Sequence, residues 1–376
     1  MVLMTSLMIL AVLLAVGIGA GVMVRNDLQI SGNLRRGAEA FYVAAAGLEW
    51  GKREVAQTKS FPPAPQNQSK NFAPGEFAVT FLSSKMVEPL SAQVVLRSAG
   101  TSHGAQQIVQ AQLTKSHDLV DAALALRGNP TAVKLTADSI FISGVDHDVT
   151  TTNPVVGAKS RNAVSTADDS IGTLVLNALG DPPRQGVLDS GPDMPAVATS
   201  DYLSSGFISE FADQLCASAA SIHSVPSTGV LVIENQVLGG LGAPQLHCIE
   251  GLSTPGDAAT FAGTVTGVGI LVVKNADLIL SGALRWEGLI LVTGNDVSLK
   301  TNGSSGTDLV GAVMVNETGI PGTDRAILDI QGTVRLLFSR QALSRIVPLV
   351  PTVAWNNLRQ SLPSIVAQNY WRIVTP

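Results

Sequence analysis

The chain opens with an apolar segment that is long enough to cross a membrane. Residues 1–24 hold no charged side chain and no proline, and about 20 apolar residues suffice to span a bilayer. A cleaved signal peptide is the alternative, but this run is longer than the apolar part of a signal sequence and no basic residue precedes it. We therefore expect residues 1–24 to be the transmembrane half of a helix.

The helical pattern continues past this segment, with no proline before Pro62. Apolar residues recur at steps of three, four and seven, which places them on one face of a helix. This expected assembly or packing face consists of Leu34, Ala38, Phe41, Ala45, Leu48 and Val55. Residues 25–57 thus form the amphipathic half of one helix of about 50 residues, roughly 80 Å long.

The two halves together resemble a known design, the N-terminal helix of type IV pilins and pseudopilins. The segment MVLMTSLMILAVLLAVGIGAGVMV is followed by ISGNLRRGAEAFYVAAAGLEW. The second part resembles most the run AGNxRxxxxAFxAAEAGLE of PilX-type pilus assembly proteins. Gly32–Arg35, Ala40–Phe41 and Ala45–Glu49 match it, except that Ala46 stands where the family usually has a glutamate. The resemblance covers about the first 55 residues.

The resemblance implies a processed N-terminus. Such proteins are made with a short basic leader that a prepilin peptidase removes, so Met1 is the candidate for the first mature residue. Thr5 would then stand where major pilins carry a glutamate, which implies a minor subunit. An upstream basic leader would also resolve a conflict, because Arg25, Arg35 and Arg36 follow the apolar segment and by themselves predict a cytoplasmic C-terminal part.

Localisation and partners follow from the same resemblance. It implies a single-pass protein of the bacterial inner membrane with a periplasmic C-terminal domain, extracellular at the pilus once assembled. The implied partners are other pilins or minor pilins, which bind through the helix, and the inner-membrane assembly platform.

The residues after the helix predict a linker and a small antiparallel sheet. Residues 58–75 are rich in proline, asparagine and glutamine, as linkers are. Three runs with alternating apolar residues follow within 76–116: FAVTF, QVVLRSAG and QQIVQAQLT. Alternation broken by turns is typical of a strand meander. We expect this meander to pack on the apolar face of the helix.

A repeat dominates the rest of the chain. Runs of a glycine and four apolar residues begin at Gly269, Gly288 and Gly311, at spacings of 19 and 23 residues, and a similar run begins at Gly229. Residues 132–144 and 328–339 have a similar pattern of apolar and polar residues. The spacing favours a parallel β-helix over residues 117–345, with a β-sandwich as the alternative. Residues 346–376 are expected to be a C-terminal cap or a tail, and the whole chain belongs to the α+β class.

Candidate chemistry is sparse. Asp146 and Asp148 flank His147 and are candidate metal ligands, although we favour a solvated turn. The charged residues of the repeats, Lys274, Asp277, Asp296 and Lys300, are candidates for a carbohydrate-active site, although nothing groups them. No motif of a common hydrolase, metalloprotease or nucleotide-binding protein is present, so we expect no cofactor and no enzymatic activity.

Composition adds two expectations. Charged residues make up only 14% of the chain and the net charge is −5 without a basic block, so nucleic acid is not an expected partner. Cys216 and Cys248 are 32 residues apart, and an oxidising periplasm favours a disulfide between them; two separate buried thiols are the alternative.

The sequence therefore predicts a non-enzymatic, minor pilin-like subunit that initiates assembly or lies at the pilus tip. Adhesion to a surface ligand or a carbohydrate is a further hypothesis. The alternatives are a pseudopilin of a type II secretion or competence system, and a membrane-anchored, carbohydrate-active β-helix protein.

Overall fold

The computed structural model divides the chain into two compact units, Met1–His117 with Ser364–Pro376, and Asp118–Pro363. It describes residues 2–58, 63–88, 91–117, 119–129, 132–136, 139–180, 184, 186–192, 194–252, 256–302, 306–319, 326–355 and 364–374. We call the first unit the helix–sheet unit and the second the parallel-sheet unit. Each is described by itself.

One helix, α1 (Val2–Gln57), runs through the predicted transmembrane and amphipathic halves without a break. Its 56 residues span roughly 84 Å at 1.5 Å per residue. The glycines that lower its intrinsic stability do not interrupt it. The long N-terminal helix that the sequence predicted is confirmed.

The antiparallel sheet of this unit is also confirmed. Its strand order is β1-β2-β3-β4-β23. The strands are β1 (Gln68–Phe72), β2 (Gly75–Glu88), β3 (Ser91–Ser102), β4 (Ala105–His117) and β23 (Ser364–Val374). Alternate residues of β3 and β4 are buried, as expected for a sheet with one covered face.

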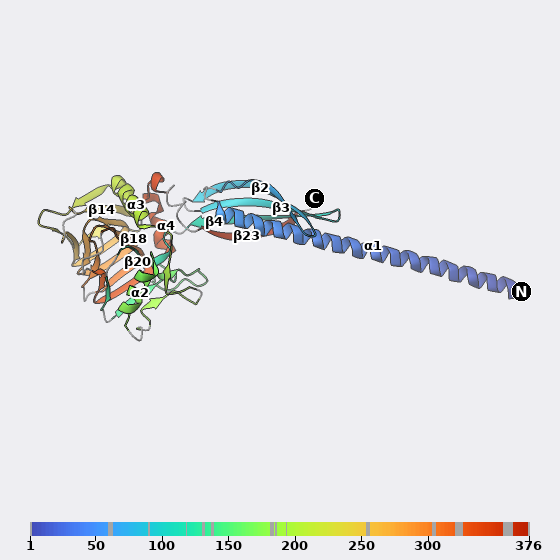
Figure 1. The fold of residues 1–376 in the computed structure, drawn as a ribbon, viewed down its shortest axis with the longest axis horizontal. Helices are drawn as coiled ribbons and strands as arrows, with labels where there is room; N and C mark the ends of the chain where they lie inside the picture. The colour runs from blue at the N-terminus through green and yellow to red at the C-terminus, as the bar shows by residue number, and fades with distance from the viewer. Residues whose placement is uncertain are drawn as a thin grey trace. The chain divides into compact units, whose positions relative to one another are not determined.

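The C-terminal half of α1 covers that face (Figure 1). Small residues let the two backbones approach closely. A Cβ atom on Gly47 would lie 2.3 Å from the Ser98 hydroxyl, and one on Gly100 would lie 2.4 Å from the Ala40 carbonyl oxygen. Ala40, Ala44 and Gly47 of the AFYVAAAGLEW stretch therefore lie on the surface against which the sheet packs.

Two expectations for this unit need correction. Residues 68–72, placed in a linker, form the edge strand β1. Residues 364–374, placed in a cap or tail, form β23 and pair antiparallel with β4. The parallel-sheet unit is thus inserted in the sequence between two neighbouring strands of one sheet. Of the expected assembly or packing face, Leu34 and Ala38 are exposed rather than packed on the sheet, so a role for them in assembly stays a prediction.

The parallel-sheet unit contains two sheets in which neighbouring strands run parallel. Within the described residues the larger sheet has twelve strands and the smaller has six. The larger comprises β5 (Ala122–Gly128), β7 (Ser139–Ser143), β8 (Asn162–Thr166), β9 (Leu188–Asp189), β10 (Val197–Thr199), β11 (Ser221–Ser224), β13 (Val237–Leu238), β14 (Gln245–Glu250), β16 (Thr264–Lys274), β18 (Ala283–Gly294), β20 (Thr307–Glu317) and β22 (Thr333–Phe338). The smaller comprises β6 (Ala132–Leu135), β12 (Val230–Glu234), β15 (Ala258–Ala262), β17 (Asp277–Leu280), β19 (Leu299–Thr301) and β21 (Ala326–Ile330).

From β14 to β22 the chain alternates between the two sheets, and each strand lies beside the strand two positions earlier. This connectivity is the one expected of a parallel β-helix, which stays our interpretation of it. The strands β16, β18 and β20 are buried on both faces. The smaller sheet contacts β16 and β18, and α3 (Ser205–Ser218) and α4 (Arg340–Ile346) contact all three strands. Double burial explains their unbroken apolar runs. The described residues of this unit also include a further helix, α2 (Asp169–Ala178), and a 3₁₀ turn, Val347–Leu349.

The repeated glycines form a ladder in the larger sheet. Gly269 pairs with Gly288, and Gly288 pairs with Gly311. A Cβ on Gly288 would lie 2.1 Å from the carbonyl oxygen of Gly269, and φ at Gly288 is +132°. The fourth run, at Gly229, leads instead into β12 of the smaller sheet, so this similar run does not belong to the glycine ladder.

Candidate functional site

The N-terminal half of α1 is an apolar surface that this chain leaves uncovered. Large side chains from Leu3 to Val24 are more than half exposed. Among the described residues, α1 is the helix that is long and apolar enough to cross a membrane. Burying such a surface in a bilayer or against other apolar helices is strongly favourable, so this segment is suited to one or both environments.

A groove of about 340 Å³ lies farther along α1, where the helix meets β4 and β23. Phe41, Ala45 and Ala46 line it from the helix, and Trp371 lines it from β23. The ring centroids of Phe41 and Trp371 are 6.2 Å apart. Of the predicted face, Leu48 and Val55 lie in the core against the sheet, whereas Phe41 and Ala45 are half-buried at this groove.

Glu39 braces the helix at the edge of the sheet. Its carboxylate accepts hydrogen bonds from Arg35 at 3.0 Å and from the Ser102 hydroxyl at 3.2 Å, and it lies 3.1 Å from His103 Nδ1. The Arg35 hydrogen bond is the main reason that the pKa of Glu39 is lowered. These contacts join α1 to the β3–β4 turn where the packed half of the helix begins.

Lys115 closes the other end of α1. Its side chain is buried, and its ammonium donates to the carbonyl oxygens of Val55, at 2.9 Å, and of Thr58. The last carbonyls of a helix have no partner within the helix, and a cation there is also favoured by the helix dipole. Burial lowers the pKa of Lys115 to about 8. One charged group thus holds the helix end to the sheet at the cost of its own desolvation.

We expect Lys115→Met to destabilise the helix–sheet unit by about 2 kcal/mol at pH 7, because buried carbonyls lose a charged donor. The folded pKa of Lys115 lies below its ordinary value, so burial penalises the charged form at pH below 8. Raising the pH from 8 to about 10.5 removes this penalty. The free energy of unfolding of the wild type should therefore rise relative to that of Lys115→Met. Hydrogen exchange of peptides from residues 91–117 in the full chain measures both effects. The exposed Lys85→Met is the control, and a pH profile shared by wild type and Lys115→Met would contradict the assignment.

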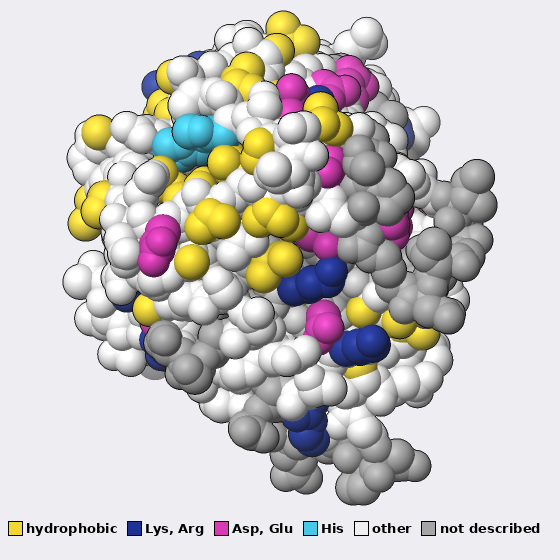
Figure 2. All heavy atoms as spheres, turned by 90° about the vertical axis from the view of Figure 1, so that its left-hand side faces the viewer, with side chains coloured by type: hydrophobic (Ala, Val, Ile, Leu, Met, Phe, Trp, Pro, Cys, Tyr) yellow, Lys and Arg dark blue, Asp and Glu magenta, His cyan; other side chains and the backbone are white. Residues whose placement is uncertain are grey.

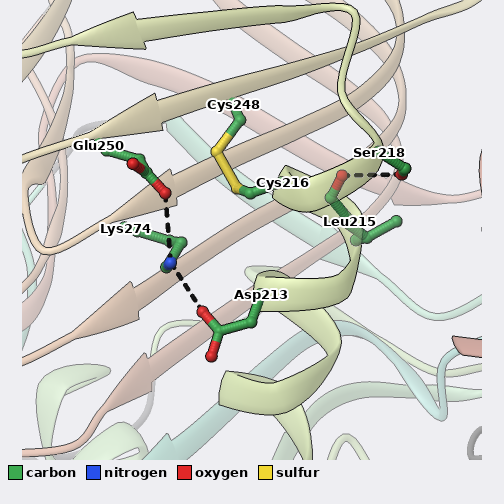
Figure 3. The surroundings of a disulfide bond; sticks show 7 residues. All are labelled: Asp213, Leu215, Cys216, Ser218, Cys248, Glu250 and Lys274. Carbon is green, nitrogen blue, oxygen red and sulfur yellow. Dashed lines mark hydrogen bonds and ion pairs between the residues drawn. A yellow bond between two sulfur atoms is a disulfide. The ribbon is translucent and has the colours of Figure 1, made fainter.

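The two cysteines are joined. Cys216, near the end of α3, forms a disulfide with Cys248 of β14, with their Cα atoms 5.3 Å apart (Figure 3). Both residues are buried. Lys274 lies beside the bond and pairs with Asp213 at 2.7 Å and with Glu250 at 3.3 Å. The disulfide and this ion pair network fix α3 to the face of the larger sheet.

Replacing both cysteines by alanine should lower the free energy of unfolding of the parallel-sheet unit by about 3 to 4 kcal/mol, as the loop-entropy relation gives for this separation. The measurement is denaturant unfolding of the full chain in detergent, with and without a reducing agent. The reductant should shift the midpoint of the wild type and leave that of the double variant unchanged. Equal wild-type midpoints under both conditions would show that the bond adds no stability.

The candidate metal ligands are used within the fold. Asp146 accepts a hydrogen bond from the backbone of Arg340 at 2.9 Å and pairs with its guanidinium at 3.3 Å. Asp148 accepts from the backbone amides of Thr151 and Thr150, which lowers the pKa of its carboxyl. His147 Nδ1 contacts the Val145 carbonyl oxygen at 2.6 Å. These contacts describe a structured turn, but Asp146 and His147 are buried, so it differs from the solvated turn that the sequence favoured.

The charged residues of the repeats are likewise paired. Asp277 is buried and accepts from the Ser298 hydroxyl and from Lys300, at 2.8 and 2.7 Å. At Asp296, the backbone amide donates a hydrogen bond to the carboxylate of Glu317 at 2.8 Å. On the face seen in Figure 2, acidic and basic side chains are interspersed among apolar and uncharged ones. Among the described residues, the one close group of potential metal ligands is Cys216, Cys248 and Glu250, and its sulfurs form the disulfide.

Sequence reasoning missed two residues that shape this region, Lys115 and Trp371. Lys115 continues the alternation of the buried residues Val109, Ala111 and Leu113. This two-residue period could have predicted that Lys115 is buried as well. Trp371 gave no such signal, because its position beside Phe41 depends on a pairing between segments about 250 residues apart.

Comparison with known proteins gives little. No protein-family model matches the chain, and no curated protein matches it. Among solved structures it is similar to the competence-associated pilin ComZ from Thermus thermophilus, at 13% identity over 90% of this chain and 97% of that one, with a TM-score of 0.22. A TM-score that low carries no argument about fold or function.

Proposed function

We propose that this protein is a minor pilin-like subunit of a type IV pilus, in which α1 is first a membrane anchor and then an assembly helix. The observation that carries the proposal is the division of α1. Its apolar N-terminal half is exposed, and its C-terminal half is packed on an antiparallel sheet within the same chain. The PilX-like sequence over the first 55 residues supports the same assignment.

The exposed half offers a surface to other subunits. In the membrane, lipid would cover the side chains from Leu3 to Val24; in a fibre, the helices of neighbouring pilins would cover them. The groove at Phe41 and Trp371 lies farther along the helix and offers a second apolar contact. We therefore propose other pilins and the inner-membrane assembly platform as partners, with the two sheet-bearing parts of the chain on the periplasmic side.

The inserted unit supports a place at the tip or in the initiating complex. It runs from Asp118 to Pro363 and makes up most of the chain. A tightly packed fibre would have to accommodate this large unit in every copy of the subunit. We propose a non-enzymatic and adhesive role for it. The paired carboxylates found at Asp277 and Asp146 support structural rather than catalytic use of those groups.

Mass spectrometry of the N-terminal peptide from native membranes tests the proposal. The PilX resemblance predicts a methylated amino group at or near Met1, formed after removal of an upstream leader. An unprocessed formyl-methionine at Met1 would contradict it and favour a plain membrane-anchored β-rich protein. A pseudopilin of a type II secretion or competence system predicts the same processing, and neighbouring genes would separate it from a pilus subunit.

A further inference from the structure

A polar pocket of about 420 Å³ lies within the parallel-sheet unit. This volume falls in the roughly 300–1,000 Å³ range of small-molecule sites. Its lining includes Asp121, Arg161, Asn162, Asp201 and Tyr202, so it brings acceptors, a guanidinium and an aromatic ring together. None of these residues was singled out by the sequence.

Three adjacent strands of the larger sheet position the lining. Asp121 directly precedes β5, Asn162 begins β8, and the Asp201–Tyr202 loop follows β10. The sheet order places β10, β8 and β5 side by side. The pocket is therefore assembled from segments that are distant in sequence and fixed by parallel pairing.

The buried side chain of Arg127 holds the wall of this pocket in place. Its guanidinium donates to the carbonyl oxygens of Leu203 and Tyr202, each at 3.1 Å. It also donates to the Ser165 carbonyl oxygen at 2.8 Å and to Asp121 Oδ2 at 3.1 Å. One arginine thus ties the loop after β10 to the start of β5, so the site is preorganised.

Two buried acceptors in the lining lack a donor. Asp121 and Asn162 are each 8% exposed. Asp121 Oδ1 and Asn162 Oδ1 have no hydrogen-bond partner among the residues that the structure describes. A buried polar atom without a partner costs about 1 to 3 kcal/mol. Both residues line the pocket, so a ligand that reaches these oxygens with hydrogen-bond donors would offset this cost.

The charges select a neutral ligand. The charge of Asp121 is already balanced, because its other oxygen accepts from Arg127 and from the Ser165 hydroxyl, so Oδ1 is suited to an uncharged donor. The guanidinium of Arg161 in the lining disfavours a metal cation, and the carboxylate of Asp201 disfavours an anion. Tyr202, with 43% of its surface exposed, adds a flat apolar face beside these polar groups.

A sugar ring combines hydroxyl donors and acceptors with an apolar C–H face. We propose that this pocket binds a saccharide, whose hydroxyls donate to Asp121 and Asn162 while its ring packs on Tyr202. The inference names a ligand class for the proposed adhesive role. It rests on that role for where the protein would meet the ligand. Binding itself is measured directly, so a failure here would leave the assembly role of α1 untouched.

The test is saturation-transfer difference NMR on the full chain in lauryldimethylamine-oxide micelles, which carry no sugar headgroup. The probes are the methyl glycosides of glucose, galactose, mannose and N-acetylglucosamine. At least one should receive saturation, and Asn162→Ala and Tyr202→Ala should each weaken its binding about tenfold, as expected for the loss of one good contact. Tyr370→Ala is the matched control, because Tyr370 is 45% exposed on β23 in the other unit, and it should bind like the wild type.

Three results would overturn the proposal. The first is that none of the four glycosides receives saturation from the wild type. The second is that a glycoside binds equally well to the wild type and to Tyr202→Ala, a variant that keeps the backbone carbonyl used by Arg127. The third is that glycine or glutamate binds in the pocket while the glycosides do not, which would assign it to an amino acid.

Discussion

Gly288→Ala is expected to destabilise the parallel-sheet unit by about 3 to 5 kcal/mol. The backbone at Gly288 has φ +132°, and holding a side chain in such a region costs on the order of 1 to 3 kcal/mol. The added Cβ would also lie 2.1 Å from the carbonyl oxygen of Gly269. Relief of that overlap requires a backbone shift within a sheet buried on both faces, which adds a cost of similar size.

Denaturant unfolding of the full chain in detergent, followed by the fluorescence of the buried Trp286, measures this effect. Gly242→Ala is the matched control, because nothing lies within 4 Å of a Cβ built there and its φ is not positive. The control should unfold within about 0.5 kcal/mol of the wild type. If Gly288→Ala matched the control, the stacked glycine register would be wrong.

Leu10→Arg combined with Leu14→Arg should release the chain from membranes. Each arginine at the centre of a spanning helix costs roughly 2.5 to 3.5 kcal/mol on insertion scales, so the pair opposes insertion by about 5 to 7 kcal/mol. Both leucines are about two-thirds exposed on the uncovered half of α1. The measurement is the fraction of the chain that stays in the membrane pellet after carbonate extraction.

Leu34→Arg is the matched control for this experiment. Leu34 is 70% exposed, close to the 68% of Leu10, but it lies after the apolar segment, beside Arg35 and Arg36. This variant should remain in the pellet. Equal retention of the double variant and of Leu34→Arg would show that residues 1–24 are not what anchors the chain.

Local patterns predicted much of the fold. Alternation in residues 76–116 marked three antiparallel strands, and the spacing of Gly269, Gly288 and Gly311 marked strands that pair in register. Both signals are periodic within a short window. The uninterrupted apolar segment and the PilX-like run likewise marked the helix.

Other features depended on information outside any short window. The pairing of β23 with β4 joins segments about 250 residues apart, so residues 364–374 were assigned to a cap or tail. Gly47 and Gly51 were left out of the expected face of α1, because a pattern of apolar side chains does not mark glycine. Their lack of a side chain is what lets the sheet approach. The polar pocket was missed because Asp121, Asn162 and Tyr202 come together only through sheet order.

Cross-linking from α1 in living cells tests the central claim most directly. A photoreactive residue at Leu10 would be activated in cells that assemble surface fibres, with one at Val156, which is 99% exposed in the parallel-sheet unit, as the background control. Our account predicts that Leu10, unlike Val156, cross-links to the N-terminal helix of another subunit in the sheared fibre fraction. Cross-links from Leu10 to lipid alone, with the chain absent from that fraction, would contradict it.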